Sequence, residues 1–515
     1  MNELDRINKA LLDGDLDACA VLLEQYCAVQ NSSSFYIQLA MVHKKRGDLE
    51  KSEYFFKRAI SLDRRNTSIY LDLALLCDPI MESNEKIEQM RSKMLNNVQI
   101  LQKGSKKLEL YDPKNIHYLN FYSAYHGKNE KEINSQIMDF ISTVEPKLLY
   151  TSEHTKSPPT PKTRIKIGFL STYLRNHTIG HLFSSLLLQL SDQHFEKTFI
   201  TTRDDLDGLT TELTKNFEHF FFIERNVFTA QLQIEAQKFD ILLYPEIGMD
   251  CFVQLLSLSR LAHIQMVTWG HPVTTGSPNI DYFLLPKEMR SKTETFREQI
   301  LELPSPNIYY KMVNSSSPNI FSTKYELPKG NLYSCPQTLY KFHPNYIPIF
   351  KGIIEKDPKS IFVLSQASGI YWSKRLLSIW KEHIPNIEQH IYWTPHINRQ
   401  EFIDMLSVCD VMIDPFPFGG GNTVLEALSV DLPVVTFPTE FARCRIAYTL
   451  YQTMNYTELI AQDIEDYIDL AVRVATDSSQ KYKTHIREKK TVLYENKQFV
   501  IDFQNSILQV WNDLF

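Results

Sequence analysis

Residues 411–428 read VMIDPFPFGGGNTVLEAL, an apolar run followed by a turn through three glycines and the beginning of a helix. Glycines let a backbone approach a ligand closely, and the first N–H groups of a helix attract an anion. The residues expected to bind a phosphate-bearing ligand are Gly420, Gly421, Asn422 and Thr423. Glu426, one turn into the helix, is expected to accept hydrogen bonds from ribose hydroxyls. The alternative is a glycine turn that only packs the helix against the strand.

Short strands and helices alternate in two series along the chain. Strands of the first series are predicted at 165–170, 198–201 and 241–244, with helices at 181–191 and 227–239. Strands of the second series are predicted from Leu332 and at 361–364, 390–393, 411–413 and 434–437, after a polar, irregular stretch at 287–325. Such alternation is typical of parallel, doubly wound sheets, so we predict an α/β chain with two Rossmann-like units facing a cleft. Ligands of such sheets bind at the carboxyl ends of the strands, inside the cleft.

The first hundred residues are predicted to be helical, because Leu, Ala and Tyr recur at three- and four-residue spacing. The window Ser33–Asn66 matches the tetratricopeptide (TPR) pattern, with Gly47-Asp48 at the turn and the small residues Ser52 and Ala59 between the helices. A weaker copy surrounds Gly14-Asp15. Two degenerate repeats fit a helical cap over the next domain as well as a peptide-binding groove.

Composition and charge exclude several classes of protein. The chain has 515 residues, too many for one core, with 43% hydrophobic residues and a formal net charge of −6. This balance gives no general attraction to nucleic acid or to an anionic membrane. No apolar run is long enough for a membrane span and no signal peptide is evident, so we expect a cytoplasmic protein. The seven cysteines lack the spacing of metal ligands, so we expect no metal site and no cofactor.

The glycine segment resembles the donor-binding loop of bacterial members of glycosyltransferase family 41, which contains O-GlcNAc transferase, SPINDLY-type transferases and adhesin N-glucosyltransferases. Further segments resemble the family in the same order: STYLRNHTIGH at 171–181, YPEIGMD at 244–250, QMVTWGHPVTTGSP at 265–278 and CPQTLYKFHP at 335–344. The likeness covers about 164–515. It implies a GT-B fold, a nucleotide-sugar donor, a protein acceptor and amino-terminal TPR-like helices.

Four segments are expected on this basis. They are a TPR-like helical region at 1–105, a helical connector and linker at 106–163, an acceptor-side Rossmann-like lobe at 164–325, and a donor-side Rossmann-like lobe at 326–515. The linker end, at 151–163, is rich in Pro, Ser and Thr, which is typical of a surface-crossing loop. The helical region also offers a surface for oligomerisation.

Lys341 is expected to neutralise the diphosphate that leaves when the sugar–phosphate bond breaks. A lysine in a cleft, together with helix N–H groups, can do this without a metal ion. Gln337 and Thr423 are expected to support it. The alternative is a surface lysine after an edge strand, but its aromatic and proline-rich flanks are unusual for a solvated charge.

His177 aligns with the family's histidine proposed as general base or acceptor-orienting group. A histidine titrates near neutral pH, although a structural histidine bonded within the loop is the alternative. Glu246, a carboxylate at a strand end, is a second candidate base that can equally cap a turn. His271, Thr274 and Thr275 are expected to shape the sugar or acceptor pocket.

Phe402 aligns with the family position that stacks on the base of the donor, although a place in the core fits an aromatic residue as well. Where eukaryotic O-GlcNAc transferases have His-Thr-Thr in the phosphate loop, this chain has Gly421-Asn422-Thr423. The departure leaves the nucleotide and the sugar open. A UDP-sugar is the family default, and GDP-fucose is known from the SPINDLY branch.

The resemblance therefore implies an inverting, metal-independent transferase that moves GlcNAc or another hexose to Ser or Thr of a protein. Three alternatives stay open at this point. The framework can glucosylate the Asn of an adhesin-like protein, it can belong to a non-catalytic TPR-type binding partner, or it can serve a nucleotide-sugar epimerase. No nucleic acid is expected as a partner.

Overall fold

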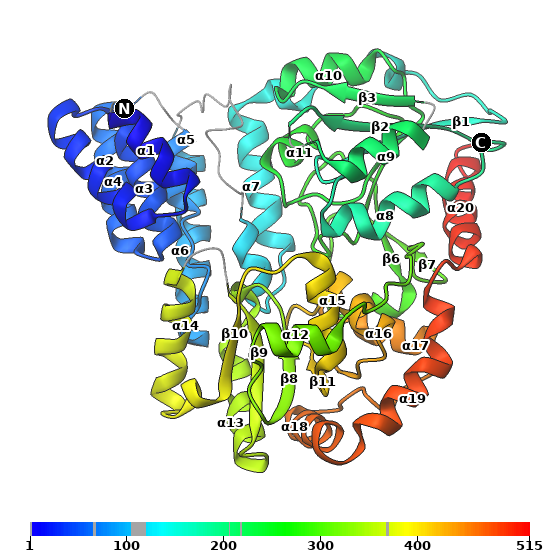
Figure 1. Ribbon diagram of the computed structural model, residues 1–515. Helices are drawn as coiled ribbons and strands as arrows, with labels where there is room; N and C mark the ends of the chain where they lie inside the picture. Colours follow the sequence, from blue (N-terminus) through cyan, green and yellow to red (C-terminus); the bar gives the residue numbers. More distant parts are fainter. Residues whose placement is uncertain (1–2, 65–67, 105–119, 205, 217–218, 367–369) are drawn as a thin grey trace.

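The chain folds into two parallel sheets flanked by helices, with a helical arm at the amino-terminal end (Figure 1). The computed structural model describes residues 3–64, 68–104, 120–204, 206–216, 219–366 and 370–515, so residues 106–119 of the predicted connector lie outside the described part. The predicted fold class, two Rossmann-like units with an all-helical region before them, is confirmed. None of the described helices has both the length and the apolar composition that crossing a bilayer requires.

The arm contains the helices α1 (Glu3–Leu12), α2 (Leu16–Gln30), α3 (Ser33–Arg46), α4 (Leu49–Leu62), α5 (Ser68–Ala74) and α6 (Asn84–Lys103). Gly47 ends α3 in the left-handed conformation with φ of +78°, which a glycine adopts without strain. Asp48 then caps α4 by accepting a hydrogen bond from the Lys51 N–H group. Ser52 and Ala59 are buried between α3 and α4, as the repeat pattern predicts.

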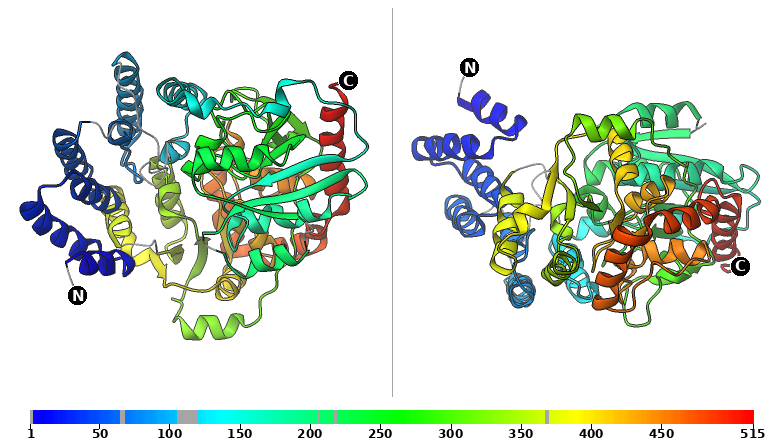
Figure 2. Two further views of the ribbon diagram at one scale, coloured as in Figure 1. Left: turned by 90° about the horizontal axis from the view of Figure 1, so that it is seen from above. Right: turned by 60° about the horizontal axis from the view of Figure 1, so that its bottom comes forward.

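The arm leans on α14 (Ile370–His383) of the second lobe. The indole N–H of Trp372 donates to the carbonyl oxygen of Lys45 at 2.8 Å, and Arg375 forms an ion pair of 2.6 Å with Asp78. Figure 2 shows the blue arm helices beside the yellow α14. The position of the arm is therefore set by the second lobe as well as by the connector.

The described part of the connector begins with a 3₁₀ turn rather than a long helix. Its elements are η2 (Phe121–Tyr125), α7 (Lys131–Val144), η3 (Pro146–Leu149) and η4 (Glu153–Lys156). Helix α7 buries Ile133, Ile137 and Ile141, which recur every four residues and so share one face. The side chain of Asn134 donates to the carbonyl oxygen of Thr274, which joins α7 to the first lobe.

The first sheet has the order β3-β2-β1-β4-β5-β6-β7, with all strands parallel. Its strands are β1 (Ile165–Leu170), β2 (Phe195–Thr202), β3 (His219–Ile223), β4 (Ile241–Tyr244), β5 (Ile264–Thr268), β6 (Tyr282–Pro286) and β7 (Gln299–Leu303). The accompanying helices are α8 (Thr178–Gln189), α9 (Gly208–Asn216), α10 (Val227–Glu235) and α11 (Cys251–Leu256), with the turn η5 (Lys287–Met289). The prediction of an irregular stretch at 287–325 is wrong in part, because it contains the edge strand β7 and the helix α12 (Pro318–Lys324).

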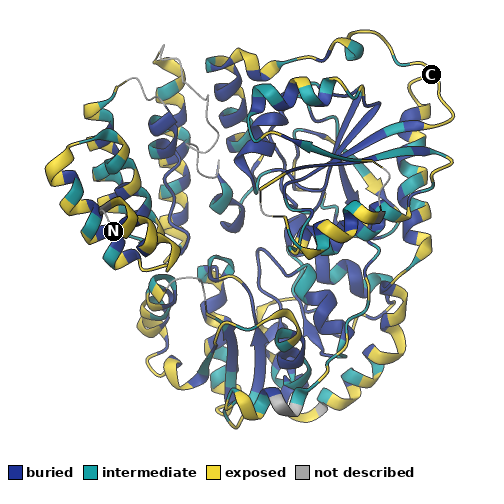
Figure 3. Cartoon of the chain, turned by 45° about the horizontal axis from the view of Figure 1, so that its top comes forward, coloured by how far each residue is buried: buried dark blue, intermediate teal, exposed yellow. Residues whose placement is uncertain are grey.

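The second sheet has the order β10-β9-β8-β11-β12, again parallel. Its strands are β8 (Asn331–Cys335), β9 (Ser360–Ser365), β10 (Ile391–Thr394), β11 (Val411–Ile413) and β12 (Val434–Val435). The remaining elements are η6 (Leu339–Lys341), η7 (Pro344–Tyr346), α13 (Ile347–Lys356), η8 (Ile387–His390), α15 (Arg399–Val408), α16 (Asn422–Ser429), η9 (Ala442–Cys444), α17 (Ile446–Thr453), α18 (Ile464–Arg473), η10 (Val474–Ser478), α19 (Ser479–Lys489), η11 (Lys490–Leu493) and α20 (Lys497–Asn512). Figure 3 shows buried residues concentrated in the sheets and on the helix faces that cover them.

The last helix, α20, returns to the first lobe. It packs against β7, and the side-chain oxygen of Gln504 accepts a hydrogen bond from the Ser191 N–H group at 3.0 Å. The chain therefore passes between the lobes once after β7 and again before α20 (Figure 1).

Candidate active site

A pocket of about 260 Å³ lies between the two lobes. The first lobe contributes His177 and His271, which follow β1 and β5 in the chain. The second lobe contributes Gln337, Lys341 and Thr423, from the segments after β8 and β11. These segments all leave the carboxyl ends of parallel strands, which is where ligands of such sheets bind.

The glycine loop, residues 414–421, joins β11 to α16, and its first residue, Asp414, holds it in place. This carboxylate accepts hydrogen bonds from the Gly420 N–H group at 2.7 Å and from the Thr436 hydroxyl at 2.9 Å. Gly421 stands at the N-cap of α16 and brings no side chain to occupy the first N–H groups of the helix. Gly421, Asn422 and Thr423 line the pocket, so the start of α16 faces it, and the start of a helix attracts anions.

Gly420 is outside the described pocket lining, and the loop has no room for a larger residue at this position. A Cβ atom on Gly420 would lie 2.6 Å from the Thr423 hydroxyl and 2.9 Å from the Gln337 amide nitrogen. Those two groups are joined by a hydrogen bond of 2.7 Å from Gln337 to Thr423. A glycine is therefore required where the loop passes beneath this bond.

Lys341 lies at the centre of this arrangement. Its ammonium donates to the carbonyl oxygen of Gly419 at 2.7 Å and to the side-chain oxygen of Gln337 at 2.9 Å. Burial lowers the pKa of Lys341 to about 8, although the nearby Asp414 carboxylate raises it. Lysine, glutamine, threonine and glycine loop are thus brought together as one polar cluster with a cation that titrates near neutral pH.

His177 forms the N-cap of α8, where its Nδ1 atom accepts a hydrogen bond from the Ile179 N–H group at 3.3 Å. Burial, followed by the charge of Arg175, lowers its pKa to about 4, so the imidazole is neutral at pH 7. A neutral imidazole that accepts at Nδ1 carries its proton on Nε2. His177 therefore offers a hydrogen-bond donor to a ligand rather than a free basic nitrogen.

His271, Thr274 and Thr275 line one small cavity of about 10 Å³, but only His271 also lines the pocket between the lobes. His271 lines the pocket, stacks on Phe121 with 5.7 Å between ring centroids, and has its pKa lowered to about 3 by burial. Thr274 and Thr275 instead donate their hydroxyls to the buried carboxylate of Glu298. Among the described residues that line the pocket, neither threonine is included.

Glu246 is fully buried beneath the loop that follows β1. Both of its carboxyl oxygens lie within hydrogen-bond distance of the Ser171 hydroxyl, at 2.8 and 3.0 Å. Burial raises its pKa well above the usual range of a glutamate. It stands outside the described pocket lining, and its printed side-chain contact is to Ser171, the first residue after β1.

Glu426 and Phe402 lie on neighbouring helices, α16 and α15, outside that lining. The Glu426 carboxylate accepts from Arg399 at 3.0 Å, and Tyr310 donates to the side chain of Asn422 at 2.7 Å. Burial raises the pKa of Glu426, and Arg399 opposes that shift. Phe402 is half-buried and packs against the core of the lobe. The Glu426 carboxylate, expected to bind a ribose, is therefore already paired with Arg399, which the sequence pattern did not single out.

An aromatic wall that was not expected from the sequence covers the other side of the pocket. Tyr125 of the connector stacks on Phe418 of the glycine loop, with 4.6 Å between ring centroids, and lies equally close to Tyr340. All three line the pocket, as does Trp269. The run FYSAY at 121–125 is aromatic, but nothing in its spacing indicates that the connector reaches the cleft.

Two parallel sheets in separate lobes, with a pocket between them, are the arrangement of the GT-B fold. Residues 313–503, most of the second lobe, match the family model described as Glycosyl transferase family 41. The match covers less than half of the chain, so it shows that the second lobe is similar to this family.

Named relatives are similar to part of the chain. The chain is 27% identical over 244 residues to the UDP-glucose:protein N-beta-glucosyltransferase of Actinobacillus pleuropneumoniae serotype 5b, covering 46% of this chain and 38% of that one. It is 26% identical over 263 residues to the probable UDP-N-acetylglucosamine–peptide N-acetylglucosaminyltransferase SPINDLY of Petunia hybrida, covering 49% and 28%. The chain thus spans about a third of the length of these relatives.

A solved structure resembles nearly the whole chain. The O-GlcNAc transferase of Thermobaculum terrenum, in a mutant form, superposes with a TM-score of 0.69 at 18% identity and covers 99% of this chain and 97% of that one. At this identity the likeness concerns the fold, and it includes the helical arm together with both lobes.

Proposed function

We propose that this chain transfers a hexose from a UDP-sugar to a side chain of a protein. The observation that carries the proposal is the Lys341 ammonium, which lies against Gly419 beside the start of α16 in the pocket between the lobes. The names of the relatives support the donor and the acceptor class, because they describe transfer from UDP-glucose or UDP-N-acetylglucosamine to protein or peptide.

The proposed reaction is a single displacement that inverts the anomeric carbon. The acceptor atom forms a bond to that carbon while the bond to the diphosphate breaks, and the leaving diphosphate keeps the electron pair. Lys341 and the first N–H groups of α16 stabilise the charge that develops there. Since these groups already supply positive potential, the step is proposed to proceed without a metal ion.

The proton of the acceptor is proposed to leave through water. His177 has its Nδ1 atom engaged at the helix N-cap, which supports a role for its Nε2–H in orienting the acceptor or a donor oxygen. Glu246 is bonded to Ser171 away from the pocket, which supports a structural role. His271, next to Phe418 and the aromatic wall, is proposed to contact the sugar or the acceptor.

The nucleoside is proposed to lie along α15 and α16. Glu426 would accept hydrogen bonds from the ribose hydroxyls, and Phe402 would stack on the base. Because Arg399 pairs with Glu426, the arginine has to share or release this carboxylate when the ribose binds. The Glu426 carboxylate would then be paired with Arg399 when the pocket is empty and hydrogen-bonded to the ribose when the donor is bound.

A hydroxyl of Ser or Thr is the proposed acceptor, and the amide of Asn is the second candidate, favoured by the similarity to the N-glucosyltransferase. A thermal-shift panel of UDP, GDP and their sugar conjugates tests the donor, and a selective rise with UDP compounds is expected. No shift with any nucleotide would remove the proposal. Mass spectrometry of a peptide library incubated with the enzyme and the donor would then identify the linked residue.

A further inference from the structure

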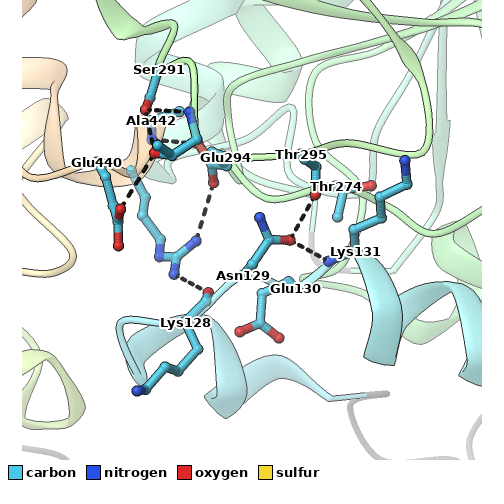
Figure 4. A network of polar contacts seen from close by, with 12 residues as sticks. Lys128, Asn129, Glu130, Lys131, Thr274, Ser291, Glu294, Thr295, Glu440 and Ala442 are labelled. Atoms are coloured by element: carbon cyan, nitrogen blue, oxygen red, sulfur yellow. Dashed lines mark hydrogen bonds and ion pairs between the residues drawn. The ribbon is translucent and has the colours of Figure 1, made fainter.

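A buried ion pair behind the glycine loop joins the two lobes. Glu294 lies between β6 and β7 of the first lobe, and Arg443 lies in η9 of the second, with 3.3 Å between a guanidinium nitrogen and a carboxylate oxygen. Arg443 is 0% exposed and Glu294 is 4% exposed. A second guanidinium nitrogen of Arg443 donates to the carbonyl oxygen of Lys128 in the connector at 2.7 Å. Figure 4 shows Glu294, Ala442 and Lys128 converging on this junction.

The same two residues hold the turn that supports the glycine loop. The second carboxylate oxygen of Glu294 accepts a hydrogen bond from the Ala442 N–H group at 2.7 Å. The carbonyl oxygen of Arg443, the next residue, accepts from the Gly419 N–H group at 2.9 Å. Gly419 in turn offers its own carbonyl oxygen to Lys341. A continuous series of contacts therefore runs from Glu294 of the first lobe to the lysine of the pocket.

Stability alone does not account for placing a charged pair here. Burying two charges costs desolvation that the ion pair offsets only with good geometry, so apolar replacements of such pairs are often as stable. The pair does fix an orientation. The planar guanidinium of Arg443 must meet Glu294 and the Lys128 carbonyl at fixed angles, which orients η9 relative to the first lobe and the connector. The ring of Phe441, 4.2 Å from the Arg443 guanidinium, restricts it further.

We propose that Glu294 and Arg443 are positioning residues for the donor diphosphate, through which the first lobe and the connector set the geometry of the glycine loop on the second lobe. The pair touches Gly419 only through the backbone of η9 and acts on Lys341 through Gly419. The effect of the pair on binding of the donor diphosphate rests on the proposed function. The effect of the pair on the glycine loop, through the contact between η9 and Gly419, does not depend on the proposed function. It can be measured without a nucleotide.

The test compares two double variants of the full chain. Glu294→Met with Arg443→Met removes the pair without leaving a buried charge unpaired. Arg91→Met with Glu130→Met is the matched control, because this buried ion pair of 2.7 Å lies at the same junction but binds Asn129 and Ser123 instead of the glycine loop. Hydrogen exchange of residues 418–423 and UDP affinity by calorimetry are measured for both variants and the wild type.

In the first variant we expect faster exchange of 418–423 and an affinity for UDP lowered by a factor of ten or more, with a melting temperature near that of the wild type. The control variant is expected to keep the wild-type exchange and affinity. Wild-type exchange and affinity in the first variant would overturn the inference, as would equal effects in the control. If the wild type binds no UDP, the proposed function fails, while the exchange rates still decide whether the pair positions the loop.

A single variant keeps the test valid if the first double variant does not fold. Arg443→Lys keeps the charge beside Glu294, but its single ammonium cannot reproduce the fork that also meets the Lys128 carbonyl. We expect exchange of 418–423 between the wild-type rate and that of an unprotected segment. A wild-type rate in this variant would contradict the inference.

Discussion

The ammonium of Lys341 donates a 2.7 Å hydrogen bond to the carbonyl oxygen of Gly419, so the lysine is held against the glycine loop. Burial lowers its pKa to about 8, and a bound diphosphate would raise it again. We expect UDP affinity to fall as the pH rises through 8, because the neutral amine cannot offset the phosphate charge. Calorimetry over this range measures the effect, and an affinity independent of pH up to about 9 would contradict it.

Replacing Lys341 should weaken binding of the sugar donor without destabilising the fold. Lys341→Met removes hydrogen bonds to a charged ligand worth about 1.5–3 kcal/mol, which corresponds to a loss of roughly ten- to hundredfold in UDP affinity. The melting temperature measured without nucleotide should change little, because the hydrogen bonds lost to Gly419 and Gln337 are offset by removing a charge from a desolvated position. The exposed Lys381→Met is the control and should bind UDP as the wild type does. A retained affinity in Lys341→Met would show that the lysine does not face the diphosphate.

Gly420→Ala tests the close approach of the loop to its neighbours. The added Cβ would meet the Thr423 hydroxyl and the Gln337 amide at less than 3 Å, so the bond between them has to break. We expect the free energy of unfolding to fall by about 1–3 kcal/mol and UDP affinity to fall at least severalfold. Gly208→Ala, where no atom lies within 4 Å of the added Cβ, should change neither. Chemical denaturation and calorimetry provide the two measurements.

Two variants of His177 distinguish its role as the N-cap of α8 from its role toward a ligand. Asparagine is also a good N-cap, so His177→Asn should keep the melting temperature while it removes the Nε2–H donor. Turnover should fall at least tenfold with little change in UDP affinity. His177→Ala should in addition lose about 1 kcal/mol of stability. Full activity in the Asn variant would mean that only the cap matters.

Phe402 can be tested with two ligands of different size. If its ring stacks on the base, Phe402→Ala should reduce UDP affinity by about 1 kcal/mol, roughly fivefold, and leave pyrophosphate affinity unchanged. If the ring serves only the core, stability falls and both affinities stay the same. Calorimetric titrations with UDP and pyrophosphate, together with thermal denaturation, distinguish these outcomes.

Much of the fold could be predicted from hydrophobic runs. Central strands such as β4 and β11 are buried on both faces, so their sequences are continuous and apolar and identify them. The edge strand β7 has only its last residue, Leu303, fully buried and lies within a polar stretch, so its sequence resembles a loop. The TPR-like pair α3–α4 was recognisable because small residues must stand where its helices touch.

The candidate site could be predicted only where it is built from local sequence. The glycine loop and the segment around Lys341 each form a continuous motif, and the sheet order brings them together. Thr274 and Thr275 belong to such a motif too, but their hydroxyls go to Glu298, more than twenty residues away. The Glu294–Arg443 pair spans 149 residues, a separation at which one sequence carries no pairing signal.

The return of α20 to β7 limits how the lobes can move. The lobes are joined covalently at two places, the segment after β7 and the segment before α20. A body tied at two points to another rotates most easily about the line through those points. Opening of the cleft is therefore expected to be a one-axis hinge rather than a free swing or a slide. The far rim, where the arm meets α14, would then travel the furthest.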